Sequence, residues 1–294
     1  MIGILRTIRN IILTALSPFG RKFHPGHYYS PLPDIHEVER VLRASPPIPK
    51  SLPGIEFNDD AQLRLLMQLA KYSASLPYVF GSHSDLRYYS PNGYYPMGDA
   101  ALLIAFLRHF QPERVVEIGS GFSSAVMLDA NELYFGNSLN LTIIDPFTQR
   151  LQELSRPGDF ERLHILKEPV QRTPLQVFDE LDAGDILFVD SSHIAKFGSD
   201  VNFLLFQVLP RLKKGVLIHF HDIYWPFEYP WEVFNQGIAW NENYLLHAFL
   251  QFNNHFTPLL FIHYLLHNYR EAVNQAIPAC VQYGGVSLWL QAAE

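Results

Sequence analysis

The chain has 294 residues, of which 48% are hydrophobic and 17% charged, with a formal net charge of −7. This composition is typical of a folded chain of one or two domains and excludes an intrinsically disordered one. The sequence has no stripe of basic residues that could bind along a phosphate backbone, so we expect no nucleic-acid partner. The one cysteine, Cys280, excludes an internal disulfide and a cysteine zinc site, and favours a buried thiol in a reducing cytoplasm.

The first residues, MIGILRTIRNIILTAL, have apolar side chains at roughly helical spacing and predict an amphipathic helix over residues 1–16. Its uninterrupted apolar core, Ile11 to Leu16, is too short to cross a bilayer and is followed by no convincing signal-peptide cleavage site. We therefore expect no transmembrane segment here. The helix is expected to pack on the body of the protein or on a second subunit, as in a homodimer.

An extended arm is predicted over residues 18–60, which are rich in proline and turn residues. Within it, DIHEVERVLR predicts a short helix capped by Asp34. Two further helices are predicted, one in NDDAQLRLLMQLAKYSASL beginning at Asn58 or Asp59, and one in DAALLIAFLRHF. We expect residues 1–84 to form this N-terminal helical and extended region, and residues 85–294 to form the main domain.

From Pro112 onward, seven short apolar runs alternate with segments of helix length. They are RVVEIG (114–119), LNLTIID (139–145), RLHILK (162–167), DILFVD (185–190), GVLIHFHD (215–222), TPLLFIHYLL (257–266) and GVSLWLQ (285–291). Such runs are typical of strands buried on both faces of a parallel sheet. They predict a doubly wound α/β fold: a mostly parallel, seven-stranded Rossmann-like sheet with helices on both faces. The last two runs are candidates for an antiparallel edge pair.

Polar residues stand at the carboxyl ends of four of these runs. They are Glu117 with Gly119, Asp145, Asp190 with His193, and His221 with Asp222. Open α/β sheets bind their ligands beyond the carboxyl ends of the strands. Because four runs carry such residues at the same edge, we expect a ligand site there.

The first of these ends, VVEIGSGFSS, forms a glycine turn. Gly119 and Gly121 allow a sharp turn and a close approach of the backbone to a ligand. The third glycine of the dinucleotide fingerprint is replaced by Ser124. Glu117 would repel a diphosphate but attract an ammonium group, such as that of S-adenosylmethionine, which carries no phosphate. Asp145, at the next run, is expected to accept hydrogen bonds from ribose hydroxyls, to cap the following helix, or both.

The other two ends predict acid–base or metal chemistry. Asp190, His221 and Asp222 are candidate ligands of a divalent cation. His193 is a candidate general base, because a neutral imidazole can remove a proton near pH 7. His219, two residues before His221, is expected to be a hydrogen-bonded histidine of the core.

VVEIGSGFSS, IIDP, GDILFVDSSH and GVLIHFHDI, in this order and spacing, resemble the class I S-adenosylmethionine-dependent methyltransferases. The chain is most similar to a bacterial branch that shares the HYYSPLPD arm and the HDIYWPFEYPWE segment. The resemblance implies S-adenosylmethionine as cofactor. It implies that the methionine end of the cofactor is bound by Glu117, Gly119, Ser120 and Gly121. Asp145 is then expected at the ribose and Glu168 near the adenine, and Asp190 is also expected to contact the cofactor.

The resemblance extends to metal-dependent O-methyltransferases of the catechol type. In these, an Asp ends strand four, an Asp-Asn pair ends strand five, and a base lies three residues after the first Asp. Here Asp190 stands at the first position, His221-Asp222 replaces the pair, and His193 stands at the position of the base. Because His in place of Asp removes a negative charge, a lower magnesium affinity or a different metal preference is implied.

The implied activity is methyl transfer to a small-molecule acceptor, most readily to a hydroxyl oxygen, with His193 and Asp190 as catalytic residues. Three alternatives remain: aminopropyl transfer on the same fold, a nicotinamide-dependent oxidoreductase, and a binding or scaffold protein without turnover. The aromatic segment 223–244 predicts either a lid over an apolar acceptor or packing over the strand ends.

Overall fold

The computed structural model describes residues 23–44, 47–73 and 85–293, so the helix predicted at residues 1–16 lies outside the described residues. The chain divides into two compact units, one of residues 1–48 and 229–240 and one of residues 49–228 and 241–294. Across the described ranges, no helix has both the length and the apolar character that crossing a membrane requires.

The smaller unit contains α3 (Ile35–Arg43) and α10 (Trp231–Phe234), which pack against each other. The predicted cap of α3 is confirmed, because the backbone N–H of His36 donates to Asp34 Oδ1 at 2.8 Å. An ion pair between Glu37 and Arg40 supports the exposed face of this helix.

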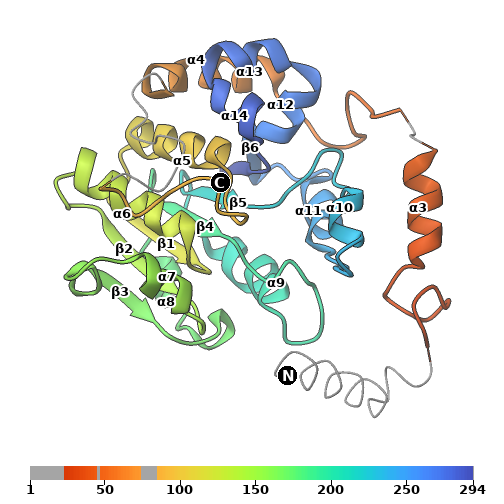
Figure 1. Ribbon diagram of the computed structural model, residues 1–294, viewed down its shortest axis with the longest axis horizontal. Coiled ribbons are helices and arrows are strands. Elements are labelled where there is room, and N and C mark those ends of the chain that lie inside the picture. The colour runs from red at the N-terminus through yellow and green to blue at the C-terminus, as the bar shows by residue number, and fades with distance from the viewer. Residues whose placement is uncertain (1–22, 45–46, 74–84, 294) are drawn as a thin grey trace. The chain divides into compact units, whose positions relative to one another are not determined.

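The larger unit is built on the predicted seven-stranded sheet (Figure 1). Its strands are β1 (Arg114–Ile118), β2 (Asn140–Ile144), β3 (Leu163–Leu166), β4 (Ile186–Val189), β5 (Leu217–Phe220), β6 (Phe256–Phe261) and β7 (Leu288–Ala292). Their order is β3-β2-β1-β4-β5-β7-β6. The first five strands are mutually parallel, and β7 pairs antiparallel with both β5 and β6. The α/β prediction is therefore confirmed, including the antiparallel pair at the edge.

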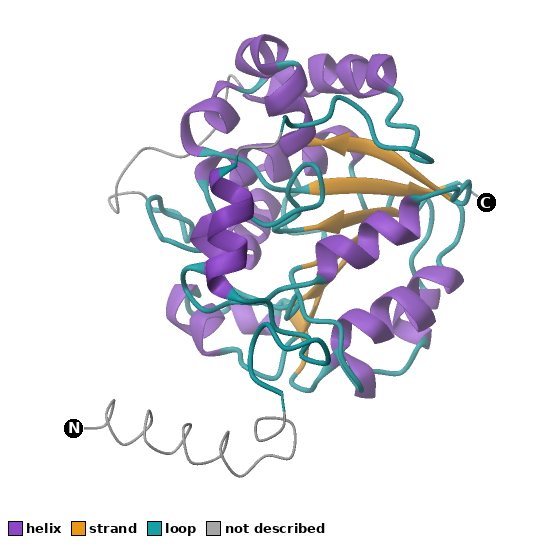
Figure 2. Cartoon of the chain, turned by 90° about the vertical axis from the view of Figure 1, so that its right-hand side faces the viewer, coloured by secondary structure: helices purple, strands orange, loops and turns teal. Residues whose placement is uncertain are grey.

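Helices lie around this sheet (Figure 2). They are α4 (Asp59–Ser73), α5 (Met97–Phe110), α6 (Phe122–Tyr134), α7 (Gln149–Leu154), α8 (Gln176–Asp179), α9 (Asp200–Phe203), α11 (Glu242–Leu250), α12 (Ile262–Asn268), α13 (Arg270–Ala276) and α14 (Pro278–Tyr283). A π-helical turn follows α9 over Leu204–Val208, and short 3-10 turns span Asp159–Glu161, Val170–Arg172 and Leu209–Arg211. The start of α4 at Asp59 confirms the predicted boundary.

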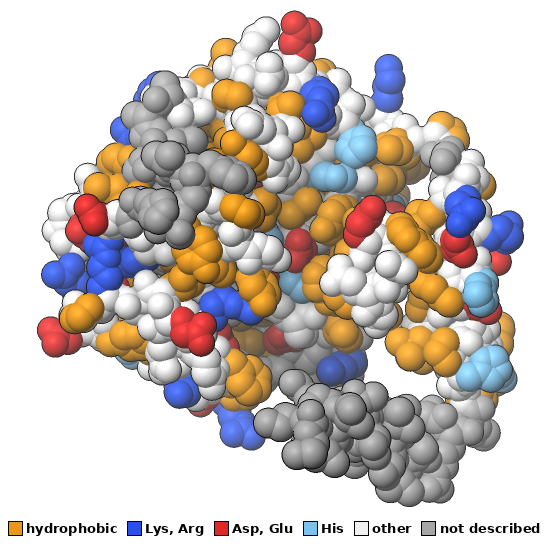
Figure 3. Space-filling model, in the orientation of Figure 1, with side chains coloured by type: hydrophobic (Ala, Val, Ile, Leu, Met, Phe, Trp, Pro, Cys, Tyr) orange, Lys and Arg blue, Asp and Glu red, His pale blue; other side chains and the backbone are white. Residues whose placement is uncertain are grey.

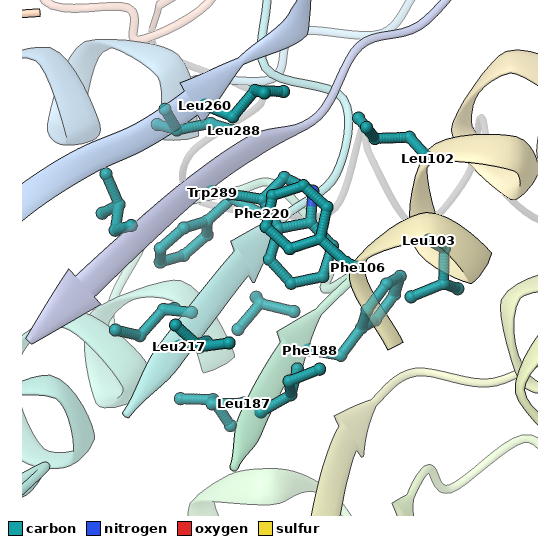
Figure 4. Close-up of a cluster of buried hydrophobic side chains, with 14 of the residues drawn as sticks. Leu102, Leu103, Phe106, Leu187, Phe188, Leu217, Phe220, Leu260, Leu288 and Trp289 are labelled. Carbon is teal, nitrogen blue, oxygen red and sulfur yellow. The ribbon is translucent and has the colours of Figure 1, made fainter. Parts of the chain in front are cut away.

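Helix α5 is the most deeply buried helix of the core, since every residue from Met97 to Leu107 is buried. It packs against α4, α6 and α14. Figure 4 shows its apolar side chains facing those of β4, β5 and β7, where the Phe106 and Trp289 rings stack with centroids 3.8 Å apart. The Cys280 thiol is buried and donates to the carbonyl of Gly98 at 3.3 Å, which confirms the predicted buried free thiol.

The sixth predicted run, residues 257–266, is wrong in its second half. The strand ends at Phe261, and Ile262 begins α12. Two backbone N–H groups mark the change: that of Phe261 donates to the Gln62 side chain and that of Ile262 to the carbonyl of Ser287. A continuous apolar run does not reveal such a change, because buried strands and buried helices have the same hydrophobic pattern.

Candidate functional site

The strand order brings the four predicted polar ends together, because β2, β1, β4 and β5 are consecutive neighbours in the sheet. Their carboxyl ends carry Gly119, Asp145, Asp190 and the pair His221-Asp222 at one edge. Acidic and histidine side chains are visible near the centre of the face drawn in Figure 3. The prediction that these residues share one edge of the sheet is confirmed.

Gly119 allows the ends of β1 and β4 to approach closely. Its φ is +86°, and a Cβ at this position would lie 2.2 Å from the carbonyl oxygen of Asp190. Any other residue would therefore be strained in its backbone and would displace Asp190. The glycine is therefore required for the close packing of the ends of β1 and β4.

A cavity of about 740 Å³ opens at this edge, within the size range of small-molecule sites. Of the residues predicted to bind the cofactor, Gly119, Ser120, Asp145 and Asp190 line it. Glu117, Gly121 and Glu168 do not line it, although Pro169 and Val170, directly after Glu168, do. Their contact with a cofactor stays a prediction.

Asp145 is held at the cavity by two hydrogen bonds. The Ser120 hydroxyl donates to Oδ2 at 2.5 Å, and the backbone N–H of Phe147 donates to Oδ1 at 2.7 Å. A carboxylate has about four acceptor positions, so each oxygen keeps room for a further donor. The arrangement suits a pair of neighbouring hydroxyl groups.

Glu117 is fully buried below the glycine turn. The hydroxyls of Ser123 and Ser124, in the first turn of α6, donate to its two carboxylate oxygens at 2.5 and 2.6 Å. Burial raises the pKa of Glu117 to about 8, although these hydrogen bonds act in the opposite direction. The carboxyl group therefore supports the turn from inside the fold.

Three side chains converge at the ends of β4 and β5. His193 Nε2 lies 3.4 Å from Asp190 Oδ1 and 3.7 Å from Asp222 Oδ2, and the three ligand atoms lie within 4.8 Å of one another. His193 and Asp222 have φ angles of 58° and 57°, in the left-handed region. Backbone strain of this kind is concentrated at functional sites. We call Asp190, His193 and Asp222 the carboxylate–histidine cluster.

Glu242, at the start of α11, anchors the histidine of this cluster and was not predicted. Its Oε2 lies 2.8 Å from His193 Nδ1, and the carboxyl group is 1% exposed. The backbone N–H groups of Asn241 and Glu242 both donate to the carbonyl of His193, at 3.0 and 3.2 Å. With Nδ1 occupied in this way, Nε2 is the nitrogen that faces Asp190 and Asp222.

Charges within the cluster stabilise one another. Burial opposes the positive charge of His193, but hydrogen bonds to Asp190 and Glu242 raise its pKa to about 10. Burial likewise opposes the negative charge of Asp190, whose pKa His193 and His221 nevertheless lower to about 2. In the absence of another cation, the imidazole therefore holds its proton at pH 7.

His221 lies behind the cluster. Its Nδ1 is 3.8 Å from Asp190 Oδ1 and 3.6 Å from Asp222 Oδ2, while its Nε2 is 3.5 Å from Asp99 Oδ2. Asp99, in the first turn of α5, is a second buried carboxylate that was not predicted. His193, which was predicted as a base, thus joins Asp190 and Asp222 in a group that could hold a cation. The predicted ligand His221 lies at similar distances from the same two oxygens, so its role as a ligand stays a prediction.

His219 belongs to the core, as predicted, and its ring stacks on Phe188 with centroids 3.8 Å apart. The expectation that it is hydrogen-bonded is wrong for Nδ1, which is buried and has no partner among the described residues. Burial and the neighbouring His221 lower its pKa well below 6.5, so the ring is neutral. Stacking replaces hydrogen bonding here, because the strand interior presents aromatic faces to the ring.

The start of the aromatic segment packs into the fold. Trp225 and Phe227 are each 2% exposed, and the Trp225 ring contacts Phe57 and Tyr264 at centroid distances of 5.1 and 4.7 Å. Of the two predicted alternatives, packing describes these residues, and they do not form an exposed lid.

Comparison with known proteins identifies the family. Residues 116–223 match a family model described as a methyltransferase domain. An uncharacterized protein of Archaeoglobus fulgidus is 33% identical over 177 residues, which are 55% of this chain and 75% of that protein. The chain belongs to the class I S-adenosylmethionine-dependent methyltransferases.

Solved structures give more remote likenesses to this methyltransferase. The SAH-bound methyltransferase PaMTH1 of Podospora anserina has a TM-score of 0.41 at 15% identity, and covers 90% of this chain and 98% of its own. The protein CmcI, described with Mg-SAM, has a TM-score of 0.40 at 19% identity, with coverages of 75% and 83%. Likenesses at this level place no individual residue of the site.

The cavity of the methyltransferase fits the family's cofactor. Gly119 and Ser120 line it without a large side chain, and at Asp145 it offers free acceptor positions beside Ser120. The carboxylate–histidine cluster also fits a divalent cation. Ligand atoms about 2.1 Å from one ion lie roughly 3.0–3.5 Å apart, close to the 3.4 and 3.7 Å observed from His193 Nε2. One imidazole with two carboxylates suits manganese, iron or zinc better than magnesium.

Proposed function

We propose that this enzyme transfers the methyl group of S-adenosylmethionine to a hydroxyl oxygen of a small-molecule acceptor. One observation carries the proposal: Asp190 belongs to both halves of the site. It lines the cavity, and its Oδ1 lies 3.4 Å from His193 Nε2 in the cluster. An acceptor held at the cluster would therefore lie beside the cofactor, which is the geometry that direct displacement requires.

In this proposal the nucleoside lies in the cavity with its ribose hydroxyls at Asp145. Gly119 and Ser120 provide the wall against which the amino acid part rests. The bound cofactor supplies an activated methyl group on its sulfonium. Three aspartates line the cavity, namely Asp145, Asp190 and Asp200. Arg150 and Lys196 also line the cavity, so the acids outnumber the cations by one, which tolerates a cationic sulfonium better than a diphosphate.

We assign the cluster as a cation site, with Asp190, His193 and Asp222 as ligands. A divalent cation bound there would lower the pKa of an acceptor hydroxyl. Glu242 would accept a hydrogen bond from the Nδ1–H group of His193 and so keep the Nε2 lone pair directed at the ion. His193 as a general base is the second candidate. It rests on the same Nε2 position but requires the imidazole to lose its proton first.

The experiment is transfer of labelled methyl from S-adenosylmethionine into the small-molecule fraction of a bacterial extract. The chain is treated with EDTA and assayed with and without added Mn²⁺. We expect label in an acceptor only when the ion is restored. Transfer that is unaffected by EDTA but absent in His193→Ala would support the general-base assignment instead.

A variant pair separates chemistry from cofactor binding. Asp222→Asn should lower turnover at least tenfold and leave the affinity for S-adenosylhomocysteine unchanged, because Asp222 does not line the cavity. Asp182→Asn, an exposed residue in an ion pair with Lys213, serves as the matched control. Cofactor binding without transfer to any acceptor would favour the scaffold protein. Turnover of decarboxylated S-adenosylmethionine would favour aminopropyl transfer.

A further inference from the structure

Arg150, in the first turn of α7, lies at the boundary of two cavities. Together with Gln149 it lines the cofactor cavity and a second cavity of about 440 Å³. The second cavity has aromatic walls that include Tyr89, Tyr94 and Phe122. The side chain of Arg150 therefore faces any ligand that extends from one cavity towards the other.

The guanidinium is held in a defined plane. Its central carbon lies 3.6 Å from the centroid of the Tyr94 ring, and that ring is in turn stacked near Phe122 with an interplanar angle of 13°. The stem of Arg150 crosses the glycine turn: a Cβ on Gly121 would lie 3.0 Å from its Cδ and 3.8 Å from its Nη1. The charged group is thus fixed beside the turn on which the amino acid part of a cofactor would rest.

Within the described ranges, no carboxylate oxygen lies within 4 Å of the Arg150 guanidinium. Glu153, one turn later in α7 and also lining the second cavity, does not form an ion pair with it, whereas Arg87 contacts Asp129, Glu132 and Asp159. An oriented guanidinium that no protein anion neutralises has its five N–H donors available to a ligand.

We propose that Arg150 binds a carboxylate at this boundary. The planar guanidinium matches a carboxylate in a paired, two-bond geometry. Besides Arg150, the cofactor cavity carries three aspartates and one lysine, Lys196, so the single negative charge of a carboxylate is preferred to the two of a phosphate. The inference rests on the proposed function, which offers two sources: the amino acid carboxylate of the cofactor and a carboxylate on the acceptor.

The test compares two nucleosides that differ in this group alone. S-adenosylhomocysteine and its decarboxylated analogue are titrated calorimetrically into the full chain and into Arg150→Gln. If the cofactor supplies the carboxylate, the substitution lowers the affinity for S-adenosylhomocysteine tenfold or more and changes the affinity for the analogue by no more than about twofold. Arg150→Lys, which keeps the charge without the fork, gives an intermediate loss. Arg270→Gln, at an exposed position, changes neither affinity.

Benzoate, titrated into the chain saturated with S-adenosylhomocysteine, tests the second source. If the acceptor supplies the carboxylate, benzoate binds the wild type and not Arg150→Gln, while the two proteins bind S-adenosylhomocysteine equally. If Arg150→Gln binds both nucleosides more weakly by the same factor, the proposal is overturned, because the substitution then acts on the shape of the cavity. The proposal is also overturned if Arg150→Gln binds both nucleosides as tightly as wild type does and wild type does not bind benzoate. If wild type binds neither nucleoside, the proposed function fails, and benzoate binding to the free chain decides the role of Arg150 by itself.

Discussion

Replacing Glu117 by Gln should stabilise the protein at alkaline pH. Glu117 is fully buried, and its pKa rises to about 8 because the charged form is removed from water. A Gln side chain has nearly the same shape and carries no charge at any pH. Its carbonyl can accept from Ser124 and its amide can donate to Ser123, so both hydrogen-bond contacts of Glu117 are kept.

The magnitude follows from the two pKa values. The folded protein binds this proton more tightly than the unfolded chain, in which the pKa has its usual value of 4.5. The bound proton of Glu117 therefore contributes its full amount to the free energy of unfolding below pH 4.5. This contribution decreases as the pH rises to about 8 and is lost above that. At about 1.4 kcal/mol per pH unit, wild type should lose roughly 4 kcal/mol relative to Glu117→Gln between pH 5 and pH 8.5.

The assay is urea unfolding of both proteins without cofactor, at half-unit pH steps from 5 to 9. The difference in free energy of unfolding should grow in favour of Glu117→Gln across this range and reach a plateau above pH 8. Glu161→Gln, at an exposed glutamate of the same domain, should show no such trend. Parallel profiles for wild type and Glu117→Gln would refute the reasoning, because they would mean that Glu117 is ionised throughout.

Three further substitutions test the site. Gly119→Ala should cost 2 kcal/mol or more in thermal unfolding and abolish S-adenosylhomocysteine binding, because its Cβ would lie 2.2 Å from the carbonyl oxygen of Asp190; an unchanged melting temperature would contradict this. Glu242→Ala should cost about 1–3 kcal/mol in urea unfolding and weaken Mn²⁺ binding, because the His193 Nδ1 proton loses its partner. Glu242→Gln should retain most of the stability and most of the Mn²⁺ affinity. If the two variants lost both equally, Glu242 would not position His193. Asp145→Ala should lower the affinity for S-adenosylhomocysteine about tenfold in calorimetry. An unchanged affinity would show that Asp145 does not bind the ribose.

The sheet could be predicted because its strands are buried on both faces and are therefore continuously apolar. Five of the seven runs pair in parallel, and the predicted edge pair is antiparallel. The prediction fails where an apolar run changes from strand to helix, at Phe261 and Ile262. At this point the backbone N–H groups donate to Gln62 and Ser287, which are distant in sequence. No local pattern contains them.

The site could be predicted as far as it depends on strand ends, because parallel strands bring their carboxyl ends to one edge. Glu242 and Asp99 were missed because they come from helices, and spacing along the chain gives no distance between a helix and a strand end. Asp99 has one visible signal: it is an acidic residue at the start of an otherwise apolar helix. A charge in such a position indicates a buried partner, which here is His221.

His193 and His221 differ in backbone conformation. Both follow a strand end closely, and the sequence predicted His221 as a metal ligand and His193 as a general base. His193 has a left-handed backbone conformation, and its Nε2 lies 3.4 and 3.7 Å from Asp190 and Asp222. His221 directly follows β5, and its Nδ1 lies 3.8 and 3.6 Å from the same two carboxylates. Residue types and spacing do not encode this difference, because His and Asp adopt the left-handed region only where the surrounding structure requires it.

The proposed function requires that the cavity at the ends of β1, β2 and β4 binds S-adenosylmethionine. The most direct measurement is a calorimetric titration of the full chain with S-adenosylhomocysteine, run in parallel with NAD. We expect saturable one-to-one binding of S-adenosylhomocysteine and no heat of binding with NAD. Saturable binding of NAD, or no binding of S-adenosylhomocysteine, would contradict it.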